Sequence, residues 1–397
     1  MSVNTDNRKI EALLTRGVEN VYPNKAFLEK QLKSGKQLTL YLGIDPTGPS
    51  LHLGHAISLM KLAEFQALGH KVIMLIGGFT AMIGDPTDKL ATRQPLTRKQ
   101  VLENCKNYKK QAGKILNFTG RNKVEVKYNN KWLDKMSFAD VIEVASKLTV
   151  QQLLERDMFD KRMKEGKEIG LHEFLYPLMQ GYDSVAMDVD GEVGGNDQTF
   201  NMLVGRTLLK KIFEKEKFVV TNKLLADPSG VKMGKTTGNM ITLDDSAEEK
   251  FGKVMAWTDG MIVGGFELCT RVSSDEIETI QKRLKSDENP RDLKLELAEK
   301  VTKLYHGAAN AKKAKENFLQ MFQKKEKPDE IKEIDLAGKT IVEVLVGAGF
   351  VKSNSEARRN LEQKGVKVND TVVEALDYKV KSGDVVQKGK RFFIKIK

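Results

Sequence analysis

Apolar residues along the first half of the chain follow two spacings, that of a buried strand and that of an amphipathic helix. The continuous apolar run at 38–44 predicts a buried strand, and apolar positions at helical spacing predict a helix at about 54–68. A second apolar run at 72–76 predicts another strand. A strand, a helix and a strand in close succession form a βαβ unit. This unit implies a parallel sheet with crossover helices.

Helical spacing dominates the rest of the chain up to residue 322. Further helices are expected over 1–36, 97–165, 172–188 (interrupted only by Pro177), 197–212 and 274–322, with a short strand at 218–220. Residues 323–330 are charged, lack apolar side chains and contain Pro328, which is typical of a linker. Beyond the linker, two short helices (340–349 and 353–363) and two strands (366–369 and 392–396) are expected.

These patterns predict an α/β protein in four parts. A Rossmann-like parallel-sheet domain is expected over 1–225, with a helical insert at about 100–165. Residues 226–322 would form a loop region followed by a helical domain. Residues 323–337 would be the linker, and 338–397 a small α+β domain.

Composition excludes several classes of protein. The chain has 397 residues, of which 40% are hydrophobic and 30% charged, and it has no run of about 18 apolar residues that could span a membrane. Its amino terminus lacks the basic start and apolar stretch of a secretory signal. Cys105 and Cys269 have neither metal-ligand spacing nor a disulfide framework. A cytoplasmic protein is therefore expected.

Positive charge is concentrated at the carboxyl end. The net charge is +12, and residues 338–397 contribute +6 of it, with 13 Lys and Arg against 7 Asp and Glu. A compact basic module of this kind favours a polyanionic partner, of which nucleic acid is the usual one. The alternative is a lysine-rich surface that is merely solvated.

Two histidines flank a glycine where the first strand passes into its helix. His52 and His55 are three residues apart on either side of Gly54. A helix amino terminus attracts anions, glycine permits close approach, and imidazoles can donate hydrogen bonds, so this motif favours a polyphosphate ligand. Capping or core histidines are the structural alternative. A zinc pair would prefer spacing i, i+4 and further ligands.

A glycine-bracketed loop at 230–238 carries a second motif. Its two lysines, Lys232 and Lys235, are three residues apart, and their ammonium groups could close on a polyphosphate. Alone, this segment could be an ordinary exposed turn. Together the two motifs resemble the HIGH and KMSKS signatures of class I aminoacyl-tRNA synthetases. Gly234 departs from the second signature, while both lysines are kept and Thr236 supplies its last hydroxyl.

Within that class, the residues between the motifs resemble the tyrosyl family. The resemblance lies in the segments 41–47, 84–89, 176–183 and 194–198. Tyr176, Gln180 and Asp183 stand at i, i+4 and i+7, so a helix would align them on one face. A polar face turned to water is the alternative for this stripe.

The resemblance implies a role for each matching residue. Tyr41 and Asp183 would bond the phenolic hydroxyl of tyrosine. Thr80, Asp85, Tyr176 and Gln180 would hold its ammonium group. Gly54, Asp197 and Gln198 would lie against the adenylate and its ribose. The ATP phosphates and the transition state would be bound by Thr47, His52, His55, Lys89, Arg93, Lys232, Lys235 and Thr236. ATP would enter as a substrate with Mg²⁺, and no tightly bound cofactor or dedicated metal site is implied. Asp188, Asp190 and Glu192 do not complete a calcium loop and are interpreted as structural.

The carboxyl-terminal residues resemble the S4 RNA-binding domain, at 353–361 and 365–369. Arg358, Arg359 and Lys364 would face RNA phosphates. The implied partners are L-tyrosine, ATP and the tyrosine tRNA. The resemblance also implies a homodimer formed through the insert at roughly 100–165.

Three other interpretations fit these residues less well. A small nucleotidyltransferase would not need the lysine loop together with the S4-like tail. A tryptophanyl enzyme should lack Tyr41 with Asp183 as a hydroxyl-binding pair. An RNA-binding protein that had lost catalysis would not need the intact set of phosphate-binding residues.

Overall fold

The computed structural model describes residues 3–85, 96–227, 229–230, 240–286, 288–323, 331–351, 353–389 and 392–397. The chain divides into two compact units, Met1–Lys315 and Glu316–Lys397. Among the described residues, no helix is both long and apolar enough to cross a membrane.

A six-stranded sheet forms the centre of the first unit. Its strands are β1 (Val18–Tyr22), β2 (Thr39–Ile44), β3 (Lys71–Ile76), β4 (Glu125–Tyr128), β5 (Gly191–Gly195) and β6 (Phe218–Asn222). They lie in the order β1-β6-β5-β2-β3-β4, and only β1 at the edge is antiparallel to its neighbour. The parallel βαβ arrangement predicted from the apolar runs is confirmed.

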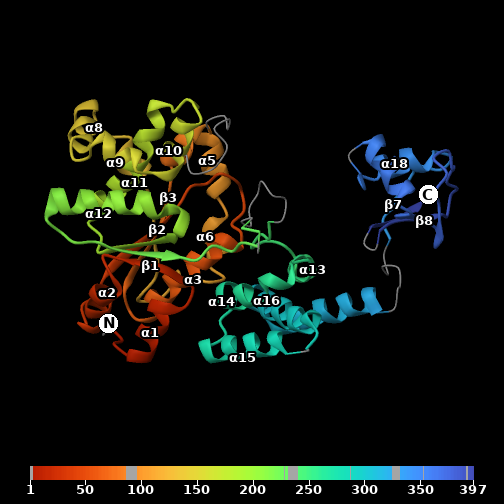
Figure 1. The fold of residues 1–397 in the computed structure, drawn as a ribbon, viewed down its shortest axis with the longest axis horizontal. Helices are drawn as coiled ribbons and strands as arrows, with labels where there is room; N and C mark the ends of the chain where they lie inside the picture. Colours follow the sequence, from red (N-terminus) through yellow and green to blue (C-terminus); the bar gives the residue numbers. More distant parts are fainter. Residues whose placement is uncertain are drawn as a thin grey trace. The chain divides into compact units, whose positions relative to one another are not determined.

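Helices cover both faces of this sheet (Figure 1). The helices before β5 are α1 (Asn7–Thr15), α2 (Lys25–Lys33), α3 (Leu53–Ala67), α4 (Thr80–Ile83), α5 (Arg98–Cys105), α6 (Tyr108–Ala112), α7 (Asn130–Leu133), α8 (Phe138–Ala145), α9 (Val150–Leu154), α10 (Asp157–Lys164) and α11 (Leu171–Met187). Those after β5 are η1 (Asn196–Gln198), α12 (Thr199–Phe213), α13 (Ala247–Met255), η2 (Asp259–Met261), α14 (Ile262–Cys269), α15 (Ser274–Lys285) and α16 (Pro290–Gln323).

Two apolar layers hold these helices to the sheet. On one face, Tyr41 of β2 and Ile73 of β3 pack with side chains of α11 and α12, among them Leu178 and Leu208. On the other face α3 contacts β2, β3 and β5, and its Phe65 ring stacks on Phe218 of β6 at 5.9 Å between centroids. The sheet is therefore buried on both sides, as its apolar strands require.

The predicted elements at 38–44, 54–68, 72–76, 172–188, 197–212 and 218–220 are confirmed, and α11 continues through Pro177. The prediction of helix throughout 1–36 is wrong, because β1 lies there and pairs with β6. The stretch 97–165, expected to be mostly helical, also contributes β4 to the sheet. Both strands lie at sheet edges, where pairing with one neighbour outweighs local preference. The helix expected over 274–322 is divided into α15 and α16, and Gly307 (φ 81°) kinks α16.

The second unit contains a five-stranded sheet with two helices. Its elements are β7 (Glu333–Ile334), α17 (Ile341–Gly347), α18 (Asn354–Glu362), β8 (Val366–Val368), β9 (Thr371–Val372), β10 (Val385–Lys388) and β11 (Phe392–Ile396), with strand order β7-β11-β10-β8-β9. Ile341, Leu345 and Leu361 of the helices pack with Val386 and Ile394 of the sheet. The two helices and two strands predicted here are confirmed, and three short strands were not foreseen.

Candidate active site

Residues predicted to bind substrate lie, together with polar residues that the sequence did not single out, at the carboxyl edge of the parallel strands. In open α/β sheets this edge is where ligands bind. Asp45 directly follows β2, Thr80 begins α4 soon after β3, and Asn129 follows β4. Helix α11 crosses the same edge and presents Tyr176 and Asp183. Residues that are distant in the chain are therefore neighbours here because their strands are parallel.

A carboxylate that was not assigned a role from the sequence joins two residues predicted to bind the substrate ammonium group. Asp45 Oδ1 accepts a hydrogen bond from Thr80 Oγ1 (2.6 Å), and its Oδ2 accepts one from the Tyr176 hydroxyl (2.8 Å). A Cβ on Gly77 would lie 1.8 Å from Asp45 Oδ1, so only glycine leaves room for this carboxylate. Burial raises the pKa of Asp45 to about 7, although the bonds from Thr80 and Tyr176 oppose the shift.

The two residues predicted to bind the phenolic hydroxyl each have a protein partner. The Tyr41 hydroxyl lies 3.0 Å from Ser184 Oγ. Asp183 accepts hydrogen bonds from Trp132 Nε1 (2.8 Å) and Asn129 Nδ2 (3.2 Å). Burial raises the pKa of both Tyr41 and Asp183, and the two hydrogen bonds to Asp183 act against that shift. These groups form a buried polar end to the site, and their joint recognition of a phenol stays a prediction.

Asp85 and Gln198, which were given different roles, are joined to each other. Asp85 Oδ2 accepts from Gln198 Nε2 (2.7 Å), and Oδ1 accepts from Arg156 Nη2 (2.8 Å). Arg156 is only 5% exposed, and nothing in the sequence distinguished it from other arginines. Gln180 Nε2 contacts Glu192 Oε1 at 3.4 Å. Asp85 and Gln180, both predicted to contact the ammonium group, are thus already held by side chains of the protein.

The histidine motif forms the amino terminus of α3. His52 is the N-cap, and its Nδ1 accepts from the Gly54 backbone N–H (3.1 Å), while His55 Nδ1 accepts from the His52 N–H (3.2 Å). With both Nδ1 atoms acting as acceptors, each neutral ring carries its proton on Nε2. Burial lowers the pKa of His52 to about 4, and burial also lowers the pKa of His55 well below its usual range. Both rings are therefore neutral hydrogen-bond donors near pH 7.

The segment 241–243, which follows the lysine loop in sequence, pairs with the histidine motif through a β-bridge. The Leu53 N–H donates to the Ile241 carbonyl (3.0 Å), and the Leu243 N–H donates to the Leu51 carbonyl (2.8 Å). Lys89, Arg93, Lys232, Lys235 and Thr236 lie outside the described residues. Thr47 and Asp197 are exposed near the same strand ends.

The buried polar groups that the sequence analysis missed share one property. Asn129, Trp132 and Ser184 contact predicted site residues, Lys217 lies over the ring of Tyr41, and Glu192, interpreted as structural, contacts Gln180. None belongs to a compact motif, so single-sequence spacing offered no signal. The glycine pair Gly77 and Gly78 after the second strand was the one available hint of close approach. Among the described residues, no group of three or more His, Cys, Asp or Glu could hold a metal ion.

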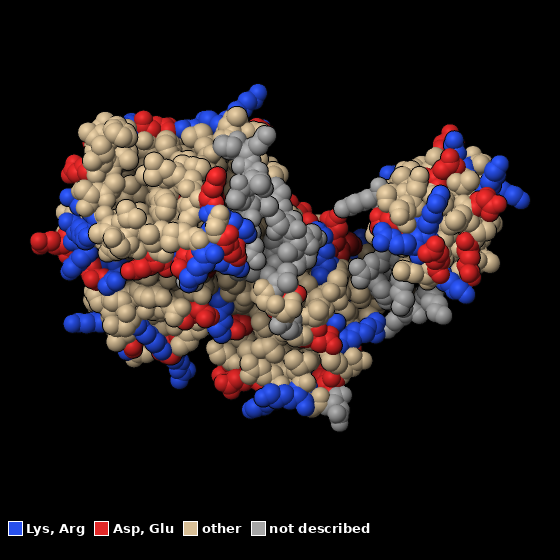
Figure 2. Space-filling view, turned by 45° about the horizontal axis from the view of Figure 1, so that its top comes forward, with Lys and Arg blue, Asp and Glu red and all other residues tan. Residues whose placement is uncertain are grey.

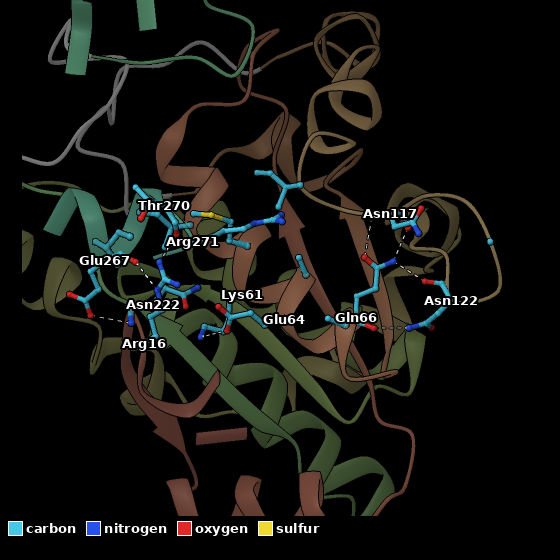
Figure 3. Close-up of a pocket in the computed structure, with 18 of the residues that line it drawn as sticks. Arg16, Lys61, Glu64, Gln66, Asn117, Asn122, Asn222, Glu267, Thr270 and Arg271 are labelled. Carbon is cyan, nitrogen blue, oxygen red and sulfur yellow. Dashed lines mark hydrogen bonds and ion pairs between the residues drawn. The ribbon is translucent and has the colours of Figure 1, made fainter. Parts of the chain in front are cut away.

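A separate pocket of about 610 Å³ lies against the later turns of α3 (Figure 3). Its charged groups are largely paired within the protein. Lys61 Nζ donates to Glu64 (2.6 Å), Arg16 donates to the Glu267 and Thr270 carbonyls, and Glu267 accepts from Lys223 (2.8 Å). The pocket shares no lining residue with the site described above, so it does not contribute to that chemistry.

In the second unit, the predicted RNA-contacting residues lie on or just after α18. Arg358 and Arg359 are exposed on this helix, and Lys364 is exposed two residues beyond its end, where its Nζ lies 3.3 Å from Glu374. Lys and Arg share the visible face of this unit with Asp and Glu (Figure 2). The surface is therefore mixed in charge, and α18 supplies two cations side by side.

Comparison with known families agrees with this site and fold. Residues 33–323 match the family model described as tRNA synthetases class I (W and Y), and residues 340–386 match the S4 domain. Tyrosine–tRNA ligase 2 of Clostridium acetobutylicum is 44% identical over 391 residues, which cover 97% of each chain. Tyrosine–tRNA ligase of Thermotoga maritima is 44% identical over 97% of this chain and 96% of its own.

A solved structure shows the same relationship. The chain resembles a crystal structure of a C-terminally truncated mitochondrial tyrosyl-tRNA synthetase from Coccidioides posadasii, with TM-score 0.64 and 26% identity over 78% of this chain and 91% of the other. The chain belongs to the tyrosine–tRNA ligases, a branch of the class I tRNA synthetases, and carries an S4 domain.

Proposed function

We propose that the chain activates L-tyrosine with ATP to tyrosyl-adenylate and pyrophosphate, and then transfers tyrosine to the 3′-terminal ribose of its tRNA. The main support is the close placement of two kinds of site at one sheet edge. A buried cluster of polar groups that includes Asp45, Tyr41 and Asp183 adjoins a helix amino terminus with two neutral imidazole donors. The polar cluster suits a small zwitterion with a hydroxyl, and the helix terminus suits a phosphate chain.

Both steps can proceed through positioning and charge stabilisation. The tyrosine carboxylate attacks the α-phosphorus in line and pyrophosphate leaves; the ribose hydroxyl then attacks the acyl carbon. Neither step requires a covalent enzyme intermediate. His52 and His55 would donate from Nε2 to phosphate oxygens as negative charge develops there. Mg²⁺ would accompany ATP as part of the substrate.

Tyrosine-dependent exchange of pyrophosphate into ATP tests this function directly. Exchange with tyrosine, and much less with phenylalanine or tryptophan, is the expected result. Exchange with tryptophan in place of tyrosine would indicate the other branch of the family. No exchange with any amino acid, from a folded protein that binds RNA, would favour a non-catalytic role.

The S4 unit would supply contacts to tRNA phosphates through Arg358, Arg359 and Lys364. Its support is the exposure of these cations on and after α18. We also propose the four-part division at 225, 322 and 337, with the insert and the S4 domain as additions to the catalytic sheet. A cytoplasmic location is proposed because tRNA charging serves protein synthesis there.

A homodimer through the insert region is also proposed. Phe138, Ile142 and Val150 of α8 and α9 are 81%, 55% and 64% exposed, and Leu171 at the start of α11 is 77% exposed. Figure 2 shows a broad uncharged area at the upper left, in the region of these helices. Exposed apolar area of this kind marks an interface.

Sedimentation velocity tests the dimer with two matched variants. Phe138→Asp places a charge on the apolar area and should yield a monomer. Phe213→Asp changes an equally apolar residue, 50% exposed at the end of α12, and should leave the dimer intact. A dimer that persists in Phe138→Asp would place the interface elsewhere.

A further inference from the structure

A buried lysine lies beneath the predicted phenol end of the site. Lys217 is 0% exposed and its partner Glu192 is 2% exposed. Lys217 Nζ donates to Glu192 Oε2, to Ser184 Oγ (2.7 Å) and to the Met202 carbonyl (3.2 Å). These three bonds use all three ammonium protons. Apolar residues could fill such a space with equal or greater stability, so the burial of this pair is not explained by stability alone.

Three elements converge on this ammonium group. Lys217 directly precedes β6, Glu192 lies in β5, and Ser184 follows Asp183 in α11. The Nζ atom is 5.5 Å from the centre of the Tyr41 ring. A Cβ on Gly205 of α12 would lie 2.7 Å from both Lys217 Nζ and Ser184 Oγ, so glycine is required for this packing. The fold thus makes room for the lysine beside both residues predicted to bind the phenol.

The bond from Lys217 sets the direction of the next hydrogen bond. Ser184 Oγ accepts from the ammonium group and lies 3.0 Å from the Tyr41 hydroxyl. A hydroxyl that accepts a charge-assisted bond becomes a better donor, because hydrogen bonds in a chain polarise one another. Either hydroxyl could donate in this pair, and the bond from Lys217 favours Ser184 as the donor to the Tyr41 oxygen. The Tyr41 proton is then left to point towards a ligand.

Glu192 is the competing acceptor for that proton. It is the register neighbour of Tyr41 across β2 and β5, and both its charge and a hydrogen bond from the Tyr41 hydroxyl contribute to the raised pKa of Tyr41. One of its oxygens is held by Lys217 and the other receives Gln180 Nε2 at 3.4 Å. Neutralisation by Lys217 weakens the pull of this carboxylate on Tyr41. Lys217 thus acts in two ways, by making Ser184 a better donor and by neutralising Glu192. Both favour a Tyr41 hydroxyl whose proton points towards the ligand.

We propose that Lys217 is a positioning residue for tyrosine recognition. Through Ser184 it orients the Tyr41 hydroxyl as a donor to the phenolic oxygen of bound tyrosine, whose own proton is given to Asp183. This inference rests on the proposed function and deepens it. The hydrogen bonds then run in one direction, from the Lys217 ammonium group through Ser184, Tyr41 and the phenol to the Asp183 carboxyl group. Phenylalanine has no hydroxyl, so it can form neither of the last two bonds.

The test compares kcat/KM for tyrosine and for phenylalanine in pyrophosphate exchange. The variant Lys217→Met with Glu192→Gln removes both charges together, so no unpaired charge is buried. Its tyrosine-to-phenylalanine ratio should fall about 2- to 13-fold, the range for one net hydrogen bond between neutral groups. The loss should lie mainly in KM for tyrosine, since ground state and transition state both contain the phenol. In the variant Lys217→Gln with Glu192→Gln, the amide introduced at position 217 can still donate to Ser184. This variant should therefore recover part of the lost tyrosine-to-phenylalanine ratio.

The same Met and Gln substitutions in a Tyr41→Phe background provide the control. With no hydroxyl to orient, they should not change the ratio further. An unchanged ratio in the first variant, an equal loss for both amino acids, or a further fall in the Tyr41→Phe background would each overturn the proposal. If the double variant does not fold, Ser184→Ala tests the same relay with a smaller change, and an unaltered ratio would be equally decisive. Absence of tyrosine-dependent exchange in the unmodified protein would instead refute the proposed function.

Discussion

Replacing Asp45 with asparagine should stabilise the free protein at alkaline pH while weakening tyrosine binding. Burial raises the pKa of Asp45 from its ordinary value of 3.8 to about 7. Between these pH values the folded chain keeps a proton that the unfolded chain has released. The free energy of unfolding therefore falls as pH rises through this window, and the loss is complete above pH 7. The Asp45→Asn variant carries no charge at this position and escapes this loss.

The magnitude follows from the same shift. About three pKa units correspond to about 4 kcal/mol. Because the Asp45 side chain is partly exposed, solvent screening reduces the expected gain at pH 8 to about 1–3 kcal/mol. At pH 5 the folded Asp45 carboxyl is still protonated and only about a third of the loss has occurred, so the gain should be correspondingly smaller. The function should change in the opposite direction, because the substitution removes a negative charge beside Thr80 and Tyr176, where the tyrosine ammonium is predicted to bind.

Urea unfolding followed by tryptophan fluorescence measures the stability effect. Both tryptophans, Trp132 and Trp257, lie in the first unit, so the signal reports on the unit that contains Asp45. Asp134→Asn is the matched control, since hydrogen bonds from Arg98 lower the pKa of that carboxyl and its replacement should be destabilising instead. Equal stability changes of the Asp45 variant at pH 5 and pH 8 would refute the reasoning. So would an unchanged KM for tyrosine at pH 8.

Three further predictions concern the reaction itself. Lys232→Ala or Lys235→Ala should slow adenylate formation in single-turnover experiments by about 10²–10³, the usual cost of one transition-state contact, with tyrosine binding nearly intact; normal rates in both would remove the loop from the mechanism. Truncation after about Lys327 should preserve pyrophosphate exchange but weaken tRNA charging and reduce its salt sensitivity, and undiminished charging would contradict an RNA-binding role for the S4 unit. Tyr41→Phe should lower kcat/KM for tyrosine by about 2- to 13-fold while changing phenylalanine activation little; an unaltered ratio would reopen the choice of amino acid.

The elements that the sequence predicted correctly are those with strong local signals. The strands at 38–44 and 72–76 are continuous apolar runs, and α3 between them carries an apolar face. The tail helices have side-chain caps, with Thr340 and Ser353 accepting from backbone N–H groups three residues on. Strands β1 and β4 were not predicted, because their stability comes from β6 and β3, which are distant in sequence.

The residues of the candidate site likewise fall into those with a local sequence signal and those without one. His52 and His55 could be recognised because the helix terminus and both rings lie within a few residues, and Tyr176, Gln180 and Asp183 because a single helix aligns them. Spacing and resemblance were therefore enough to predict the class of chemistry, which the family comparison confirms, and to propose the ligands. The spacing of these residues is local, and local spacing can be read directly from the sequence.

Only the tertiary structure revealed the partners that set the charge and orientation of those groups. Asp45 was visible in its motif, but its raised pKa depends on burial against Thr80 and Tyr176. Glu192 resembled its neighbours Asp188 and Asp190 in sequence, yet they pair with Lys215 near the surface while Glu192 meets Lys217 in the core. Burial and contact across strands depend on how the sheet is assembled, since the strength of an ionic interaction depends on its surroundings as well as on the residues that form it.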